Sequence, residues 1–201
     1  MIDLGGGSCE VTASDGGTIK SMVSMPLGAV RLQEEFLRTD PPAKEDVARL
    51  KQFIDRELKR AERKMGTPRV GLVIATSGTA SALAEASAYL RSAGKGKKAA
   101  KGQVAKGRVG KKQVEESTAS AAEVRKLADR LAKMTNAERE AVPGIGPRRS
   151  EIIVGGALVY ASLLERMGLK IAEGMLEVDK SMKFQEEMGQ WVDPASFVAV
   201  S

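Results

Sequence analysis

The chain has 201 residues, of which 42% are hydrophobic, and it carries a formal net charge of +6, no histidine and a single cysteine, Cys9. A lone cysteine excludes an intramolecular disulfide, and the absence of histidine excludes His-based metal sites and Ser-His or Cys-His nucleophile pairs. Any chemistry must therefore use carboxylates, hydroxyls, backbone N–H groups, Arg or Lys, with a hard metal ion as a partner.

Membrane and targeting signals are not evident in the sequence. No apolar run approaches the roughly 20 residues that span a bilayer. The N-terminus lacks a basic segment followed by a signal-type apolar core. We therefore expect a cytoplasmic protein with one compact domain and an insertion, and no membrane partner.

The positive charge is concentrated in one segment. Without its eight basic residues, 24 of the 32 basic residues remain against 26 acidic ones, a balance of −2. The segment is mostly Gly, Ala and Lys, which cannot offset its ordering entropy, so we expect a flexible basic insertion at residues 94–112. We favour a solvated low-complexity loop over a mobile arm that catches polyanions, and nucleic acid is not an expected partner. The basic residues are Lys95, Lys97, Lys98, Lys101, Lys106, Arg108, Lys111 and Lys112.

The chain opens with a short strand, three glycines, a hydroxyl and a second strand. Gly5, Gly6 and Gly7 lack the Cβ atoms that would block a tight turn, so their N–H groups can approach an anion closely. Asp3 can hold a divalent cation or a water that bridges to phosphate, and Ser8 can donate a hydrogen bond to a phosphate oxygen. The sequence therefore predicts a phosphate-binding hairpin, and a plain glycine-rich turn is the competing interpretation.

A β-meander and two helices follow the glycine turn. Residues 9–13 and 18–25 are predicted strands joined by a turn at Asp15-Gly16-Gly17. A helix is expected from about Leu27 to Leu37, and Gly28 either presents its N–H to a ligand or simply separates two elements. From Lys44 to Met65 the apolar residues follow a helical period, which predicts a long amphipathic helix.

A second candidate ligand loop follows a buried strand. Val70 to Ala75 is a continuous apolar run of strand length. Thr76-Ser77-Gly78-Thr79 comes next and opens a helix that is expected to end near Tyr89. Small and hydroxyl residues between a strand and a helix N-terminus favour ligand binding, and capping of the helix by Ser77 or Thr79 is compatible with it.

The last informative stretch carries two arginines. After a predicted helix from Ala121 to Met134 and a cap at residues 135–138, Pro147 suits the first position of a helix that runs to about Met167. Arg148 and Arg149 would then lie in its first turn, where cations are disfavoured, which indicates an anionic partner or pairing with surface acids. Gly155-Gly156 suits close packing on the sheet or a nearby ligand. Beyond Leu169 we expect only a short strand at residues 175–178.

These stretches, taken in order, resemble the Ppx/GppA phosphatase family of exopolyphosphatases and guanosine pentaphosphate phosphohydrolases. The resemblance implies an α/β fold, namely a ribonuclease H-like lobe of the actin-like ATPase superfamily with a mixed sheet flanked by helices. It implies a lobe at residues 1–168 and a C-terminal extension at 169–201. The residues that carry the resemblance are Asp3-Leu4-Gly5-Gly6-Gly7-Ser8 with Glu10, Leu27-Gly28-Ala29-Val30-Arg31-Leu32, Thr76-Ser77-Gly78-Thr79, Pro143-Gly144-Ile145, Arg149-Ser150-Glu151-Ile152-Ile153 and Gly156-Ala157.

The resemblance also implies that this chain is the second, C-terminal lobe alone. Members of the family carry another phosphate loop and the catalytic glutamate in the first lobe, so we expect no catalytic residue here and no hydrolysis by this chain alone. Glu10 and Glu151 are unconvincing substitutes, because Glu10 follows the turn on a strand whose side chains alternate in direction and Glu151 would pair with Arg148 and Arg149. The sequence departs from the family where Ser150-Glu151 replaces an Ala-Asp pair.

Carried over to this chain, the site of the family binds phosphate and Mg²⁺. Asp3 would hold the metal, the glycine turn with Ser8 would bind phosphate, Gly78 and Thr79 would line the cleft, and Arg149 would contact polyphosphate or the extra phosphates of a nucleotide. In the complete enzyme, water would attack a terminal phosphoryl group.

The expected partners are inorganic polyphosphate or guanosine pentaphosphate and tetraphosphate, and the missing first lobe; a homodimer stays open. Two alternative functions also stay open. The chain could be an ATP-binding lobe of a kinase or filament protein of the same superfamily. It could also be a non-catalytic polyanion-binding protein that uses the Lys-rich segment.

Overall fold

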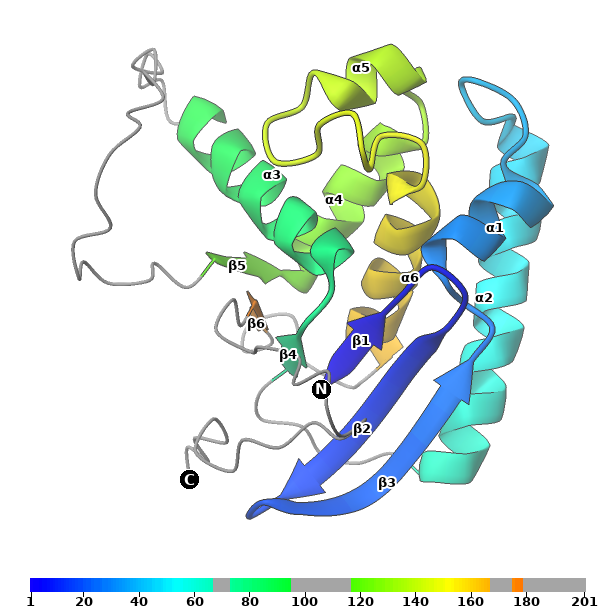
Figure 1. The fold of residues 1–201 in the computed structure, drawn as a ribbon, viewed down its shortest axis with the longest axis vertical. Coiled ribbons are helices and arrows are strands. Elements are labelled where there is room, and N and C mark those ends of the chain that lie inside the picture. The colour runs from blue at the N-terminus through cyan, green and yellow to red at the C-terminus, as the bar shows by residue number, and fades with distance from the viewer. Residues whose placement is uncertain (67–72, 95–116, 167–174, 179–201) are drawn as a thin grey trace, which may run out of the picture.

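The computed structural model describes residues 1–66, 73–94, 117–166 and 175–178 (Figure 1). Almost all of the predicted basic insertion lies outside these residues, as does the predicted C-terminal extension apart from its short strand. The first half of the predicted strand at Val70 to Ala75 also lies outside them. No helix in the described part of the chain is long and apolar enough to cross a membrane.

The strands form a mixed sheet in the order β3-β2-β1-β4-β6-β5. The first three are antiparallel neighbours, which confirms the predicted β-meander, and β4 runs parallel to β1 and to β6. The strand β5, antiparallel to β6, has no counterpart among the predicted elements. The bounds are β1 Ile2–Leu4, β2 Cys9–Asp15, β3 Thr18–Met25, β4 Val73–Ala75, β5 Ser117–Ser120 and β6 Met175–Val178.

Six helices accompany these strands in the described ranges. The long amphipathic helix α2 has the bounds that its apolar period predicted, and α4 and α5 each begin with a capping box, at Ser120 with Glu123 and at Thr135 with Glu138. The predicted cap at residues 135–138 is thus confirmed. The bounds are α1 Ala29–Phe36, α2 Lys44–Met65, α3 Gly78–Gly94, α4 Ala121–Leu131, α5 Asn136–Glu140 and α6 Ile153–Arg166.

Helix α6 lies at the centre of the core, between α1, α2 and α4 (Figure 1). Its two glycines allow neighbours to approach its backbone. A Cβ atom at Gly155 would lie 3.1 Å from Leu32 of α1, and one at Gly156 would lie 2.6 Å from the methyl group of Thr79 in α3. The glycines therefore serve close packing, although against two helices rather than against the sheet. Burial of Leu32 here stabilises the fold by about 1.5–3 kcal/mol.

The start of α6 differs from the sequence prediction. Residues 147–152 form consecutive turns, and the helix begins at Ile153 rather than at Pro147. The amides of Arg149 and Ser150 both donate to the Gly146 carbonyl, at 3.3 and 3.2 Å, which makes a tight bend. The carbonyl of Ser150 accepts a hydrogen bond from the side chain of Arg139, at 2.7 Å. Arg148 and Arg149 therefore precede the helix, and the electrostatic argument from its first turn does not apply to them.

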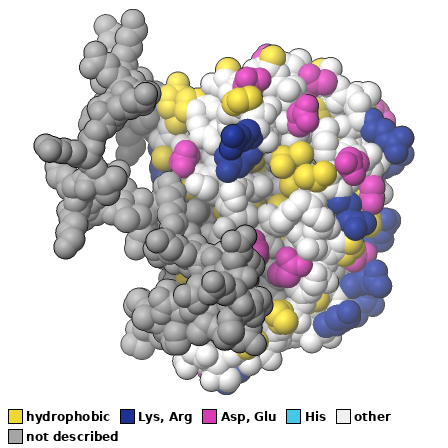
Figure 2. All heavy atoms as spheres, in the orientation of Figure 1, with side chains coloured by type: hydrophobic (Ala, Val, Ile, Leu, Met, Phe, Trp, Pro, Cys, Tyr) yellow, Lys and Arg dark blue, Asp and Glu magenta, His cyan; other side chains and the backbone are white. Residues whose placement is uncertain are grey.

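The described surface mixes charges of both signs. Figure 2 shows acidic and basic side chains interspersed on the visible face, with basic ones along the edge formed by α1 and α2. This mixture agrees with the near-neutral balance that the sequence gives outside the basic segment.

Candidate functional site

The turn between β1 and β2 is held against the start of α1. The Gly5 amide donates to the Ser8 carbonyl at 3.0 Å, which closes the turn. The first amides of α1 then bind the carbonyls of the turn: Ala29 N–H donates to Gly5 O at 2.9 Å and Val30 N–H to Gly6 O at 3.0 Å. The helix end that would otherwise attract an anion is thus used to orient the turn.

Arg31 completes this arrangement. Its amide donates to the Gly6 carbonyl at 3.1 Å and its Nε to the Gly7 carbonyl at 3.0 Å. Three successive carbonyls, whose lone pairs would repel an anion, are therefore occupied by α1. Among the hydrogen bonds between described residues, none uses the amide of Gly6 or Gly7 as a donor, and both glycines are exposed. The turn can consequently present two N–H groups to an anionic ligand.

Gly28 has a role that neither of its sequence interpretations included. A Cβ atom at this position would lie 2.3 Å from the Gly6 carbonyl oxygen and 2.3 Å from the Gly7 carbonyl carbon. Only glycine therefore allows the turn to dock on α1. The requirement is a close approach of two backbones, which the local sequence around Gly28 does not reveal.

Asp3 and Glu10 lie directly opposite each other on β1 and β2. Their neighbours Ile2, Leu4 and Cys9 are buried, so the two carboxylates share the opposite face of the sheet. Burial, and next the charge of Glu10, raise the pKa of Asp3 above its ordinary value, while a polar contact with Thr76 opposes the rise. Two carboxylates that repel each other in a partly buried position are a suitable pair of ligands for a divalent cation.

Glu10 is the residue of this pair that sequence reasoning missed. Strand alternation was the reason to discount it as a catalytic group, yet the same alternation places it beside Asp3 because Leu4 pairs with Cys9 across the turn. Ser24 on β3 donates a hydrogen bond of 2.6 Å to Oε1 of Glu10 and orients its carboxylate. In the described part of the chain, no group of three or more Asp, Glu, Cys or His residues is placed to hold a metal ion. Further ligands would be water and phosphate oxygens.

The second candidate loop lies beside the first because β4 is parallel to β1. Ile2 pairs with Ala75, and the Thr76 amide donates to the Ile2 carbonyl at 3.2 Å. The carboxyl ends of both strands therefore meet at one edge of the sheet, which is where ligands bind in open α/β sheets. The Thr76 hydroxyl oxygen is buried and lies beside the Asp3 carboxylate, where it opposes the rise in the pKa of Asp3.

Ser77 and Thr79 differ in how they serve this loop. The Ser77 hydroxyl accepts a hydrogen bond of 3.2 Å from the Ala80 amide, so Ser77 caps α3 as one interpretation of the sequence anticipated. Thr79 is buried, with 6% of its surface exposed, and its methyl group packs on Gly156. A contact between Thr79 and a ligand stays a prediction, and it would involve the backbone of Thr79 rather than its side chain.

Arg149 lies over the first residue of α3. A Cβ atom at Gly78 would be 2.8 Å from Nη2 and 3.1 Å from Nε of this guanidinium. No salt bridge joins Arg149 to a described carboxylate, and the expected pairing of Arg148 and Arg149 with Glu151 is not formed. An unpaired cation at a helix N-terminus is unfavourable unless an anion binds between them.

A buried arginine fixes the turn that carries Arg149. This residue is Arg139, which is 2% exposed. Its Nη1 donates a hydrogen bond to the Met134 carbonyl at 2.6 Å, and its Nη2 donates one to the Asp40 carboxylate at 3.2 Å. Its Nε holds the Ser150 carbonyl. Burial lowers the pKa of Arg139, and the charge of Asp40 opposes this. Sequence reasoning missed Arg139 because a charged residue on a short helix is usually a solvated one.

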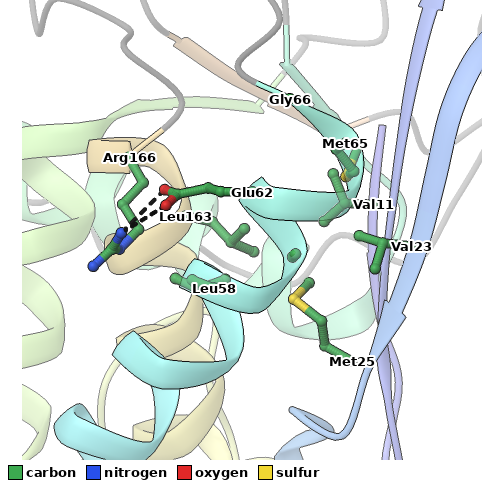
Figure 3. Close-up of a pocket in the computed structure, with 10 residues that line it drawn as sticks. Val11, Val23, Met25, Leu58, Glu62, Met65, Gly66, Leu163 and Arg166 are labelled. Atoms are coloured by element: carbon green, nitrogen blue, oxygen red, sulfur yellow. Dashed lines mark hydrogen bonds and ion pairs between the residues drawn. The ribbon is translucent and has the colours of Figure 1, made fainter.

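The described residues also form an apolar pocket (Figure 3). Because Val11 follows Glu10 on β2 and lines this pocket, the pocket lies on the other face of the sheet from the carboxylate pair. Its one charged pair is Arg166 with Glu62, at 3.0 Å. Because the side chain of Arg166 is paired with Glu62 and the other lining residues are apolar or glycine, this pocket does not suit a phosphate chain. The other residues that line it are Val11, Val23, Met25, Leu58, Ala61, Met65, Gly66 and Leu163.

Comparisons with known proteins agree on one family. The Ppx/GppA phosphatase family model matches residues 1–175. Exopolyphosphatase 1 of Mycobacterium tuberculosis is 31% identical over 175 residues, which are 86% of this chain and 45% of that protein. A Ppx/GppA enzyme of Aquifex aeolicus superposes with a TM-score of 0.66 at 23% identity, over 89% of this chain and 52% of that one.

A second solved structure gives the same result. An exopolyphosphatase from Cytophaga hutchinsonii superposes with a TM-score of 0.65 at 24% identity, over 89% of this chain and 51% of that one. These superpositions confirm the predicted α/β fold with a mixed sheet flanked by helices. The chain spans about half the length of the relatives that it matches.

Proposed function

The chain belongs to the Ppx/GppA phosphatase family, and from this membership we propose that it is the phosphate-binding part of a phosphoanhydride hydrolase that acts on inorganic polyphosphate. The names of its relatives, exopolyphosphatases from Mycobacterium tuberculosis and Cytophaga hutchinsonii, support this substrate. Guanosine pentaphosphate offers the same anhydride chemistry and is the alternative that a binding experiment compares.

One observation carries the proposal. In the turn at residues 5–8, the first three carbonyls accept hydrogen bonds from α1, and the amides of Gly6 and Gly7 have no described acceptor. Backbone N–H groups held in this way bind phosphate without reorganisation, because the turn is already formed before the ligand arrives. The unpaired guanidinium of Arg149, which lies over the first residue of α3, would hold the next part of the same phosphate chain.

We propose Asp3 and Glu10 as the protein ligands of Mg²⁺. This ion is usually bound by one or two carboxylates together with water and phosphate oxygens, which fits a pair of carboxylates beside a phosphate-binding turn. When bound, Mg²⁺ would neutralise charge on the phosphoryl oxygens. The hydrogen bond from Ser24 would keep Glu10 turned toward Asp3.

We further propose that these residues bind the phosphate chain and do not hydrolyse it by themselves. Hydrolysis needs a carboxylate that is free to orient the attacking water within hydrogen-bond reach of it. Glu10 is engaged with Ser24 and with the proposed metal, and Glu151 is exposed within the same turns as Arg149. The water-positioning glutamate would belong to the partner lobe that the family resemblance implies.

Calorimetric titration of the purified chain with tripolyphosphate and Mg²⁺ tests the binding site. We expect Gly6→Val to abolish binding, because the new side chain would crowd Val30, whose Cγ2 is 3.3 Å from a Cβ at position 6, and cover the free amides. Arg149→Gln should weaken binding about tenfold, as expected for one charge-assisted hydrogen bond. Lys126→Gln removes the same charge from an exposed position on α4 and is the matched control.

The outcomes separate the proposal from its alternatives. No binding of tripolyphosphate by the unmodified chain, or equal binding by Gly6→Val, would overturn the proposed site. Tighter binding of guanosine tetraphosphate than of tripolyphosphate would favour a guanosine nucleotide as the substrate. Stronger stabilisation by ATP than by either ligand would favour a nucleotide-binding lobe. Phosphate release by the chain alone at a rate typical of enzymes would overturn the claim that it is inactive.

A further inference from the structure

A buried tyrosine contacts the second loop of the proposed site. Tyr160 of α6 is 0% exposed, and its hydroxyl lies 2.8 Å from Oγ of Ser77. Among the described residues, Ser77 is the hydrogen-bond partner recorded for this hydroxyl. Burial raises the pKa of Tyr160, so the hydroxyl keeps its proton. The contact joins the middle of the core to the residue that caps α3.

The direction of this hydrogen bond follows from counting donors and acceptors. A serine hydroxyl has one proton and two lone pairs, and one lone pair of Ser77 already accepts from the Ala80 amide. If Ser77 donated to Tyr160, the tyrosine proton would be buried without a described acceptor. An unsatisfied buried donor costs about 1–3 kcal/mol. Tyr160 therefore donates to Ser77 and occupies its second lone pair.

The consequence concerns the proton of Ser77. With both lone pairs occupied, the hydroxyl can act only as a donor, and no described residue is recorded as its acceptor. Ser77 is partly exposed, so this proton can reach a ligand. We propose that Tyr160 makes Ser77 a dedicated hydrogen-bond donor to a phosphoryl oxygen at the start of α3, beside Arg149. This inference rests on the proposed function and adds Ser77 as a binding residue with Tyr160 as its positioning residue.

A neighbouring observation points to an anion at the same place. The guanidinium of Arg149 lies over Gly78, the residue after Ser77, without a described carboxylate partner. A donor that cannot also accept selects oxygens that only accept, such as those of ionised phosphate, over ligand groups that carry their own protons.

A double-mutant cycle on ligand affinity tests the inference. Ser77→Gly removes the hydroxyl with little loss of helix capping, since glycine is nearly as good a cap as serine. Tyr160→Phe keeps the buried ring. Titrated with tripolyphosphate and Mg²⁺, Ser77→Gly should bind about tenfold more weakly and Tyr160→Phe about threefold to tenfold more weakly. In the Ser77→Gly background, Tyr160→Phe should change the affinity less than twofold.

Stability is measured on the same variants, because a merely structural contact would lower the melting temperature and leave the affinity unchanged. Ser77→Thr retains the hydroxyl and should recover most of the affinity. Additive losses in the cycle, or affinities within twofold of the unmodified chain for both single variants, would overturn the inference. If Arg149→Gln weakens binding while the cycle shows no coupling, the proposed function stands and this inference fails. If the unmodified chain does not bind tripolyphosphate, both fail.

Discussion

The two loops at the edge of the sheet prepare for an anion in different ways. The turn at residues 5–8 relies on its backbone, because α1 occupies its carbonyls and leaves two amides free. The loop at residues 76–79, together with Arg149 that lies over it, relies on side chains. Ser77 contacts the buried Tyr160, and the turn that carries Arg149 is held by the buried Arg139. The first loop should therefore be sensitive to a Cβ atom added where it docks on α1, and the second to single hydroxyl or guanidinium groups far from the ligand.

The largest expected effect comes from Gly28→Ala, which disturbs the turn at residues 5–8. The added methyl group would overlap the carbonyls of Gly6 and Gly7 at 2.3 Å, so the turn must move away from α1. We expect a loss of about 3 kcal/mol in the free energy of unfolding, at the upper end for overpacking, together with loss of tripolyphosphate binding. Urea denaturation measures the first effect and calorimetry the second.

Gly7→Ala is the matched stability control, because a Cβ at position 7 would meet nothing within 4 Å. It should change the free energy of unfolding by no more than about 0.5 kcal/mol. Equal stability of the Gly28→Ala and Gly7→Ala variants would show that docking of the turn on α1 does not depend on glycine at position 28.

The next largest effect is expected from Arg139→Met, which disturbs the turn that carries Arg149. The change leaves the Ser150 and Met134 carbonyls without their donor and Asp40 without its buried partner. Asp40 is half-exposed and can be solvated, so the loss should be about 2 kcal/mol of unfolding free energy rather than the larger penalty of a fully buried pair. Tripolyphosphate affinity should fall as well, because the turn that carries Arg149 is released.

A second cycle sharpens this prediction. Once Arg149→Gln is present, Arg139→Met should still lower the stability but should add little to the loss of affinity. Independent losses of affinity from the two changes would mean that Arg139 does not act through Arg149.

The smallest effect concerns pH and the carboxylate pair. The pKa of Asp3 is higher in the folded state than in the unfolded state. The free energy of unfolding therefore falls as the pH rises from the unfolded-state pKa of Asp3 through its folded-state pKa. Above both pKa values the loss of stability is complete. Asp3→Asn should therefore stabilise the metal-free chain slightly at neutral pH, and this gain should vanish in acid. Thermal melting between pH 3 and pH 7, a range of about four units around the ordinary Asp pKa, measures it.

In the presence of Mg²⁺ and tripolyphosphate, Asp3→Asn should make the chain less stable than the unmodified chain, rather than more stable. The unmodified chain should gain stability from Mg²⁺ with tripolyphosphate at neutral pH, whereas Asp3→Asn and Glu10→Gln should not. A variant that loses Asp3 and keeps the full response to Mg²⁺ would exclude the pair as the metal site.

Sequence reasoning succeeded where neighbouring residues decide the structure. The helix from Lys44 to Met65, the hairpin around the glycine turn and the cap at Thr135 each follow from periodicity or from contacts within a few residues. It failed at the start of α6, because Arg139, 11 residues before Ser150, takes the Ser150 carbonyl and holds the preceding residues in turns. Local propensity at Pro147 cannot report such a contact.

The candidate site shows the same division. The glycines of the turn and Asp3 were predicted from the sequence because their residue types carry the chemistry, and their contact with a ligand stays a prediction. Glu10 was discounted, although its position follows from the register across the turn, and Tyr160 could not be identified because a buried aromatic residue on a helix usually serves packing alone. The direction in which Thr79 points depends on Gly156, which is 77 residues later, and no local pattern connects the two.

The pairing of β1 with β4 has a consequence for ligands of different length. Ile2 pairs with Ala75, so the two loops stand on adjacent strands, about 4.8 Å apart in the direction of the sheet's hydrogen bonds. A single orthophosphate can fill only one loop, whereas a linear chain of phosphates that occupies one loop is already tethered at high effective concentration beside the other. We therefore expect affinity to rise steeply from orthophosphate to the shortest chain that reaches both loops, and only slowly with further length.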